Sequence, residues 1–418
     1  MTTQAPPDAI QRRTVRTLVG SQVLGGVGLS AGIAVGALLA EDVSGSAKFA
    51  GLGGTFQVLG AAVIAIPMAR VMAAHGRRPG LVLGYGLAAA GAVGLVTAGV
   101  IRNFPLLLVA SVLFGGATAS NSQSRYAAAD LALPAHRARD LSIVVWATTI
   151  GSVIGPNLAG PSAPVAEALG LPELTGPFVF SLVGLALAIA VIFLRLRPDP
   201  LLEARRRSLA DGEASGPAHG SVSRGLQVAA GIPGARLGIA TLALGHVTMV
   251  SVMVMTPLHM SHGDAGLEVI GFVISIHVLG MFAFSPLTGF AVDRFGGRAV
   301  AVAGSIVLST ATLLASASPE GDSVTLVAGL FLLGLGWSCT LVAGSTMLTA
   351  AVPLRERPGV QGASDMLMGL MAGLGGAIAG VVVDRASFQA LALGALGVAV
   401  TIGLAAALTA IRPGPAVP

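Results

Sequence analysis

Methionine and histidine residues are concentrated in one short window of the sequence, from His246 to Met281. The chain has 12 Met and 7 His. The window alone holds the methionines Met249, Met253, Met255, Met260 and Met281 and the histidines His246, His259, His262 and His277. Thioether sulfur and imidazole nitrogen are the soft and borderline ligands expected for copper, above all Cu(I). The residue types therefore predict copper chemistry in this window.

Two pairs in the window have helical spacing. Met249 and Met253 are four residues apart, and so are His277 and Met281. Residues four apart lie on one face of a helix, one turn from each other. Two such helices facing each other could offer four convergent ligands.

The composition indicates that these helices lie in a membrane. Of 418 residues, 54% are hydrophobic and 10% are charged. A large soluble protein needs more charge to cover its surface. Apolar runs long enough to span a bilayer recur along the whole chain. They predict twelve transmembrane helices, near residues 17–40, 49–72, 80–101, 104–128, 141–160, 177–195, 236–260, 267–290, 298–317, 323–349, 359–383 and 387–411.

The basic residues predict the orientation. If the N-terminus is cytoplasmic and twelve spans alternate, only Lys48, Arg102 and Arg385 fall on the outer side. This is the positive-inside pattern, and it predicts that both termini are cytoplasmic. The net charge of +5 then reflects membrane topology. No stripe of basic and aromatic residues supports binding of nucleic acid.

The chain divides into two similar halves. We expect an N-terminal six-helix bundle at 1–194, a polar cytoplasmic linker at 195–235 and a C-terminal six-helix bundle at 236–418. The predicted fold is an all-α membrane protein. Two six-helix halves around a central substrate site are a known transporter plan.

A loop motif adds a resemblance to a known family. The sequence from Gly289 to Arg298 resembles the loop signature of the major facilitator superfamily, with Gly289, Asp293, Arg294, Gly296 and Arg298 at the matching positions. The resemblance implies a gating loop in which Asp293 braces the cytoplasmic gate of the C-terminal half. The first copy of the motif departs from the pattern, because Ala69 and Ala73 stand where the family has Gly and Asp.

Depth in the membrane selects the candidate ligands. At ~1.5 Å per residue, Met249 and His277 both lie near the middle of a ~30 Å hydrocarbon core. Met is often only a packing residue, but a mid-membrane His is costly and is a candidate functional residue. We therefore expect Met249, Met253, His277 and Met281 to bind one transported copper ion.

Four further residues are candidate accessory ligands. His246 continues the stripe of Met249 along the seventh span. His259, Met260 and His262 lie at its outer mouth, where they could capture copper, although an aqueous loop also tolerates His.

The two pairs, in this order and on these spans, resemble the bacterial CcoA-like copper importers of the superfamily. The resemblance implies a secondary transporter that imports copper across the inner membrane and supplies assembly of cbb3-type cytochrome oxidase. Copper is then the substrate, and no cofactor is bound permanently. The expected partners are the lipid bilayer and a cytoplasmic or periplasmic copper carrier, and the expected state is a monomer.

Alternatives remain open. The fifth-span sequence from Gly151 to Pro161 partly resembles a motif of drug:proton antiporters, so the alternative is a drug or metabolite exporter of the same superfamily. Asp365 in the eleventh span could couple protons or cap its helix. No nucleophile–base set and no phosphate loop occur, so we expect no enzyme. Neither the copper oxidation state nor the driving force follows from the sequence.

Overall fold

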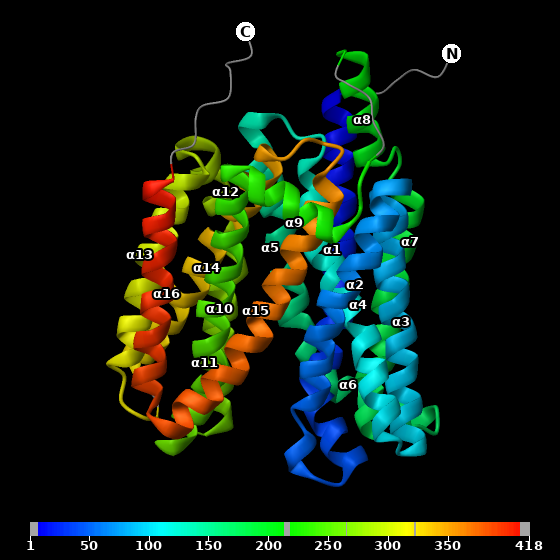
Figure 1. The fold of residues 1–418 in the computed structure, drawn as a ribbon. Coiled ribbons are helices and arrows are strands. Elements are labelled where there is room, and N and C mark those ends of the chain that lie inside the picture. Colours follow the sequence, from blue (N-terminus) through cyan, green and yellow to red (C-terminus); the bar gives the residue numbers. More distant parts are fainter. Residues whose placement is uncertain (1–6, 213–217, 265, 322, 410–418) are drawn as a thin grey trace.

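The computed structural model describes residues 7–212, 218–264, 266–321 and 323–409, and within them the secondary structure is helical (Figure 1). The α-helices are α1 (Pro7–Ser44), α2 (Leu52–His75), α3 (Arg77–Ile101), α4 (Phe104–Ala129), α5 (Arg137–Asn157), α6 (Ala159–Ala168), α7 (Gly176–Arg195), α8 (Pro200–Ala210), α9 (Val222–Gly231), α10 (Pro233–His262), α11 (Leu267–Phe282), α12 (Ser285–Phe295), α13 (Gly297–Ser316), α14 (Val324–Ala351), α15 (Arg357–Arg385) and α16 (Phe388–Leu408).

The all-helical membrane fold predicted from the sequence is confirmed. In the described residues, eleven helices are long and apolar enough to cross a membrane, and the bent pair α5–α6 makes a twelfth. The bend between these two helices is 55°. It lies between Pro156 and Pro161, and proline removes a backbone donor and bends a helix. The eighth span is also broken, between α11 and α12, where Pro286 lies in the first turn of the new helix.

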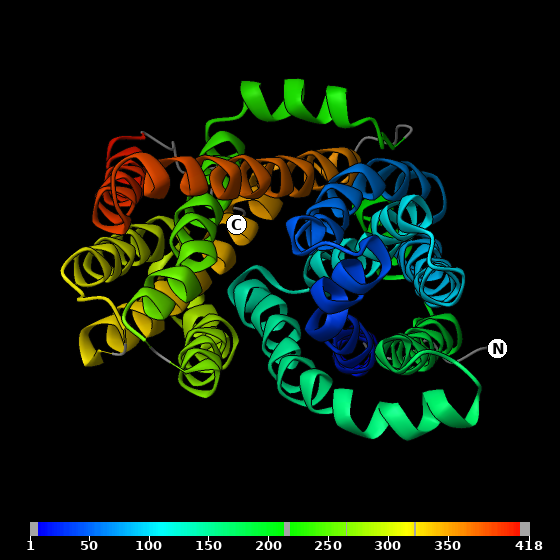
Figure 2. The ribbon, with the colours of Figure 1, turned by 90° about the horizontal axis from the view of Figure 1, so that it is seen from below.

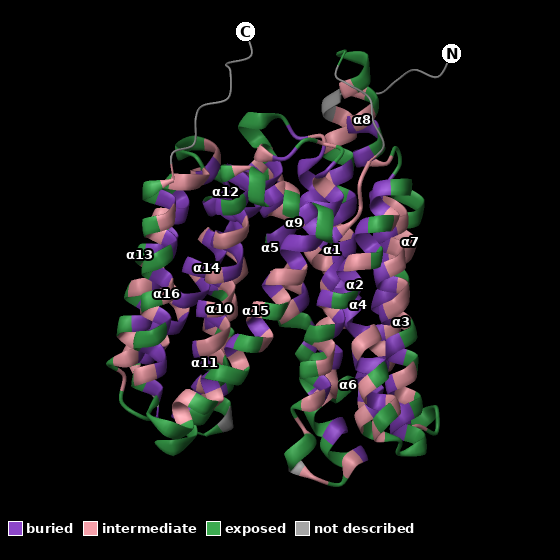
Figure 3. Ribbon diagram, viewed as in Figure 1, coloured by how far each residue is buried: buried purple, intermediate pink, exposed green. Residues whose placement is uncertain are grey.

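The helices form two bundles, α1–α7 and α10–α16, shown on the right and left of Figure 1. The start of α1, the end of α16 and the linker helix α8 lie at one end of the molecule, here called the linker end. Each bundle has its own apolar core. The core of the second bundle continues into the first at the linker end, through Tyr126, Leu141 and Val145. Figure 3 shows buried residues inside each bundle and where the bundles meet.

The two halves contact each other mainly at the linker end. On α15, a Cβ added at Gly362 or Gly369 would touch Ala69 or Ala62 of α2, so these small residues let the two backbones approach. Farther along α15, a Cβ added at Gly373 or Gly376 would meet nothing within 4 Å. The conformation is therefore closed at the linker end, and α15 leaves α2 toward the opposite end.

The linker is attached to both halves. The carbonyl of His219 accepts a hydrogen bond from the amide of Gly359 at the start of α15. Arg224 of α9 pairs with Glu356 at 2.9 Å, and α9 lies beside α15 (Figure 2). On the other half, Arg205 donates to the carbonyl of Ala73 at the end of α2. The linker thus occupies the region where the first copy of the loop motif lacks its acidic residue.

Candidate functional site

His277 is buried, with one ring nitrogen hydrogen-bonded and the other without a partner among the described residues. It lies within α11 and is 1% exposed. Its Nδ1 lies 2.8 Å from the carbonyl oxygen of Leu330 in α14. Because a carbonyl only accepts, Nδ1 carries the hydrogen, and the neutral ring keeps a free lone pair on Nε2. That Nε2 is buried and has no hydrogen-bond partner among the described residues. Metal-binding histidines are commonly held in this way by their second nitrogen.

Met281 lies one turn from His277, on a face of α11 that packs closely against α14. A Cβ added at Gly334 of α14 would overlap the carbonyl oxygen of His277 and approach the amide of Met281. The absence of a side chain at Gly334 therefore permits this close approach of the two helices. Met281 itself is half-buried at the edge of the apolar core. His277 and Met281 thus lie on one helix, four residues apart, as the sequence predicts.

Met249 and Met253 lie on α10, which does not pack along α11 in the described residues. Both helices pack along α14. Met249 is 5% exposed and Met253 is half-buried, and both belong to the apolar packing of the second bundle. The helix that α10 and α11 share as a neighbour is therefore α14.

His246 already has a partner. Its Nδ1 accepts a hydrogen bond of 2.8 Å from the indole Nε1 of Trp337. The indole ring of Trp337 in turn packs edge-on against Phe282 of α11, with centroids 5.5 Å apart. Because indole only donates, the neutral imidazole of His246 has its hydrogen on Nε2 and no free lone pair. His246 therefore joins α10 to α14 in this conformation and leaves no nitrogen for a metal.

The three residues expected at the mouth have different environments. His259 is 9% exposed, stacks on Phe388 with ring centroids 4.1 Å apart, and has its Nε2 3.1 Å from the carbonyl of Pro319. Met260 is fully buried in the core. His262 is exposed, and its Nδ1 lies 4.0 Å from Glu320. Only His262 is free to meet an ion from the solvent.

The loop residues connect the two halves. Both carboxylate oxygens of Asp293 accept hydrogen bonds of 2.9 Å, from the amides of Ala138 and Arg139. Asp293 thus caps the start of α5, so it joins the C-terminal half to the N-terminal half at the linker end. Anionic groups stabilise a helix N-terminus.

The other loop positions have separate roles. Gly289 lies against Ser142 of α5, where a Cβ would overlap that side chain. Gly296 has a φ of 86°, which favours glycine, and it ends α12. Arg298 donates to the carbonyls of Ala406 and Ala407 at the end of α16. Arg294 is exposed.

A buried network of charges joins the halves and was not predicted. Arg125 of α4 pairs with Asp365 of α15 at 2.6 Å, and both side chains are at most 6% exposed. Gln123 donates to the second oxygen of Asp365. Close by, Arg77 pairs with Asp130 at 2.7 Å and donates to Gln361 of the second half at 2.6 Å. The capping alternative for Asp365 is wrong, because the residue lies in the interior of α15 and its oxygens bond across the interface.

The signal for this network was present in the sequence. Arg125 and Asp365 are ionisable groups next to long apolar runs, where such groups are costly unless they are paired. The ion pair between them could not be predicted from the sequence, because 240 residues separate the partners.

Comparison with known proteins establishes the family. The family model described as the Major Facilitator Superfamily matches residues 18–268 and 237–418. The chain belongs to the major facilitator superfamily. It is therefore a multi-pass membrane transporter and not an enzyme.

Two relatives are similar to this chain over most of their lengths. The chain is 36% identical over 385 residues to the MFS-type transporter YdeG of Bacillus subtilis (strain 168), which covers 92% of this chain and 89% of YdeG. It is 27% identical over 364 residues to the riboflavin transporter RfnT of Brucella anthropi, covering 85% of each.

Solved structures share the fold. The human organic anion transporter MFSD10 superimposes with a TM-score of 0.76 at 19% identity, covering 96% of this chain and all of that one. FucP in its outward conformation gives a TM-score of 0.67 at 17% identity, covering 95% and 99%.

Proposed function

We propose that this superfamily member imports copper across the bacterial inner membrane, with the linker and both termini in the cytoplasm. The observation that carries the proposal is His277, whose Nδ1 is fixed by the carbonyl of Leu330 while its buried Nε2 has no partner. A desolvated nitrogen of this kind suits Cu(I), and Met281 adds a soft thioether one turn away.

In this proposal, Met249 and Met253 do not share one four-ligand site with His277 and Met281. They lie on α10, which packs along α14 and not along the helix of His277. We infer that His277 and Met281 form the principal copper site. The methionines of α10 then provide separate copper-binding positions along the transport path. A small ligand set also suits transport, because a site must bind well enough to fill and weakly enough to release. Delivery to cbb3-type cytochrome oxidase assembly belongs to the same proposal.

The conformation agrees with import. If the linker lies in the cytoplasm, the end at which the halves meet is the cytoplasmic one, and an importer must adopt such a state to take up its substrate from outside. The direction itself rests on the resemblance to the copper importers.

A second candidate is transport of an organic solute, in line with a metabolite or drug antiporter. The similarity to the riboflavin transporter RfnT over 85% of the chain favours it. The buried pair Arg125–Asp365 also offers a charge that could couple solute movement to protons.

Uptake by vesicles that contain the pure protein separates the two candidates. The proposal expects radioactive copper to enter, with silver competing and with riboflavin, zinc and a cationic dye having no effect at tenfold excess. Uptake of riboflavin without uptake of copper would make the second candidate the better one.

A further inference from the structure

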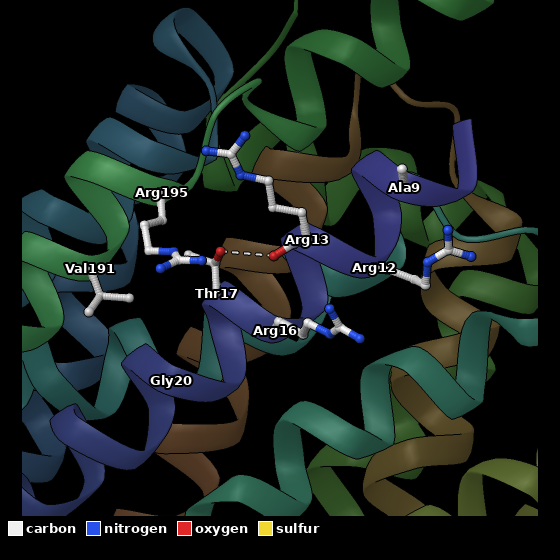
Figure 4. A pocket seen from close by; sticks show the side chains of 8 residues that line it. All are labelled: Ala9, Arg12, Arg13, Arg16, Thr17, Gly20, Val191 and Arg195. Atoms are coloured by element: carbon white, nitrogen blue, oxygen red, sulfur yellow. Dashed lines mark hydrogen bonds between the residues drawn. The ribbon is translucent and has the colours of Figure 1, made fainter. Parts of the chain in front are cut away.

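A groove lined by arginines lies outside the transport path, between the first turns of α1 and the last turn of α7. Its volume is about 510 Å³. Four basic side chains line it, Arg12, Arg13, Arg16 and Arg195, and its floor includes Gly20 and Val191 (Figure 4).

The floor of the groove is open because α1 has a glycine there. A Cβ added at Gly20 would already lie 3.9 Å from the side chain of Val191, so any longer side chain at this position would fill the space. Thr17 bonds its own helix through the carbonyl of Arg13 at 2.8 Å. Figure 4 shows Arg195 reaching from α7 toward Thr17. Two helices therefore contribute charge to one hollow.

Within the described parts of the chain, these four guanidinium groups have no acidic partner. All four residues are exposed, and among the described residues none of them forms an ion pair. Other arginines near this end do have carboxylate partners, as Arg77 has Asp130 and Arg224 has Glu356. Four like charges repel one another, so the groove favours an anion. Guanidinium groups match the geometry of a phosphate, to which they can bind with two parallel hydrogen bonds.

The surface below the groove is apolar. Val183, Leu187, Val191 and Arg195 follow one another at intervals of four along α7 and so share one helix face. Val183 is 54% exposed and Leu187 is 48% exposed, so this face is not covered by the protein. In a bilayer it faces acyl chains. The arginines of the groove lie at the end of this apolar face, where the apolar spans of α1 and α7 meet the polar part of the chain.

We propose that the groove binds the phosphodiester headgroup of an anionic phospholipid, with an acyl chain along Leu187 and Val183. A phosphate group alone would satisfy the arginines, but only a lipid also covers the exposed apolar face directly beneath them. Basic pockets beside membrane helices at the cytoplasmic surface suit anionic headgroups. The proposal is independent of the transported substrate.

The test measures lipid retained by the purified full-length protein. Native mass spectrometry would compare the wild type with Arg13→Gln/Arg195→Gln in mixed phosphatidylglycerol and phosphatidylcholine. The matched control is Arg70→Gln/Arg236→Gln, which removes two exposed arginines at the same end but outside the groove. We expect the groove variant to retain at least tenfold less phosphatidylglycerol and the control to match the wild type. Equal retention by all three proteins would overturn the proposal.

Two further arms identify the anion and guard against misfolding. Inorganic phosphate at millimolar concentration should not displace the lipid. If it does so, or if phosphatidylcholine is retained as well as phosphatidylglycerol, the site is not one for an anionic lipid. In the wild type, a photoactivatable phosphatidylglycerol with its reactive group in the acyl chain should label the α7 face at residues 183–191. Labelling spread evenly over the spans would contradict the proposal even if the variant failed to fold.

Discussion

At the scale of single residues, the buried imidazole of His277 is the feature that most needs explanation. A buried polar atom without a partner costs about 1–3 kcal/mol, and a histidine far from any aqueous surface adds to that cost. The contact from Nδ1 to Leu330 fixes the ring and leaves Nε2 directed at no other group in the described structure. A ligand for Nε2 would remove the cost, which is why the copper proposal rests on this atom.

The two mouth histidines should respond differently to substitution. His259→Ala removes the ring stacked on Phe388 and the contact with Pro319, so it should lower the free energy of unfolding by about 1–2 kcal/mol. His262→Ala should leave stability unchanged, because the side chain is exposed. Thermal unfolding of both variants in one lipid mixture measures this. Equal stability of the two variants would show that His259 has no structural role.

At the scale of helices, the close contact of α11 with α14 positions the candidate site. Gly334→Ala would place a methyl group on the carbonyl oxygen of His277 and force the helices apart, at a cost of about 1–3 kcal/mol. We expect weaker copper binding together with this loss of stability. Gly376→Ala is the matched control, because a Cβ there meets nothing within 4 Å. Titration of Cu(I) against a competing chelator measures the copper affinity of the two variants. Identical affinities would show that the close contact of α11 with α14 does not affect copper binding.

The sequence predicted which segments form helices better than which helices touch. Long apolar runs specify spans because unsatisfied backbone is costly in lipid, and the spans were placed correctly. Prolines 156, 161 and 286 mark the two breaks, but their effect depends on neighbours that the sequence does not show. The sequence does not show that α10 and α11 each pack along α14 and not along each other, because packing within a bundle is decided by side chains far apart in the sequence. The same reason hid the contact of Asp293 with α5.

At the scale of the whole molecule, buried polar groups hold the linker end closed. Arg125, Asp365, Gln123, Arg77 and Gln361 join the halves through side-chain bonds. Asp293 adds a cap from one half to the other. Opening this end must break these bonds, so the network can set the barrier between the two access states.

The pair Arg125–Asp365 should behave as a coupled unit. Arg125→Gln or Asp365→Asn alone leaves one buried charge uncompensated and should destabilise the protein by about 3–5 kcal/mol. The double variant has no charge to compensate and should recover most of this loss. Thermal unfolding of the four proteins gives the interaction free energy. Additive losses would show that the pair is not coupled.

The central claim is that His277 binds the transported copper. Its most direct test is the initial rate of radioactive copper uptake into vesicles that contain wild type, His277→Leu or Met255→Leu at equal protein abundance. Met255 is the control because it lies in the same window but outside both spaced pairs. We predict that His277→Leu lowers uptake at least twentyfold, while Met255→Leu retains more than half of the wild-type rate. Normal copper uptake by His277→Leu would contradict the claim.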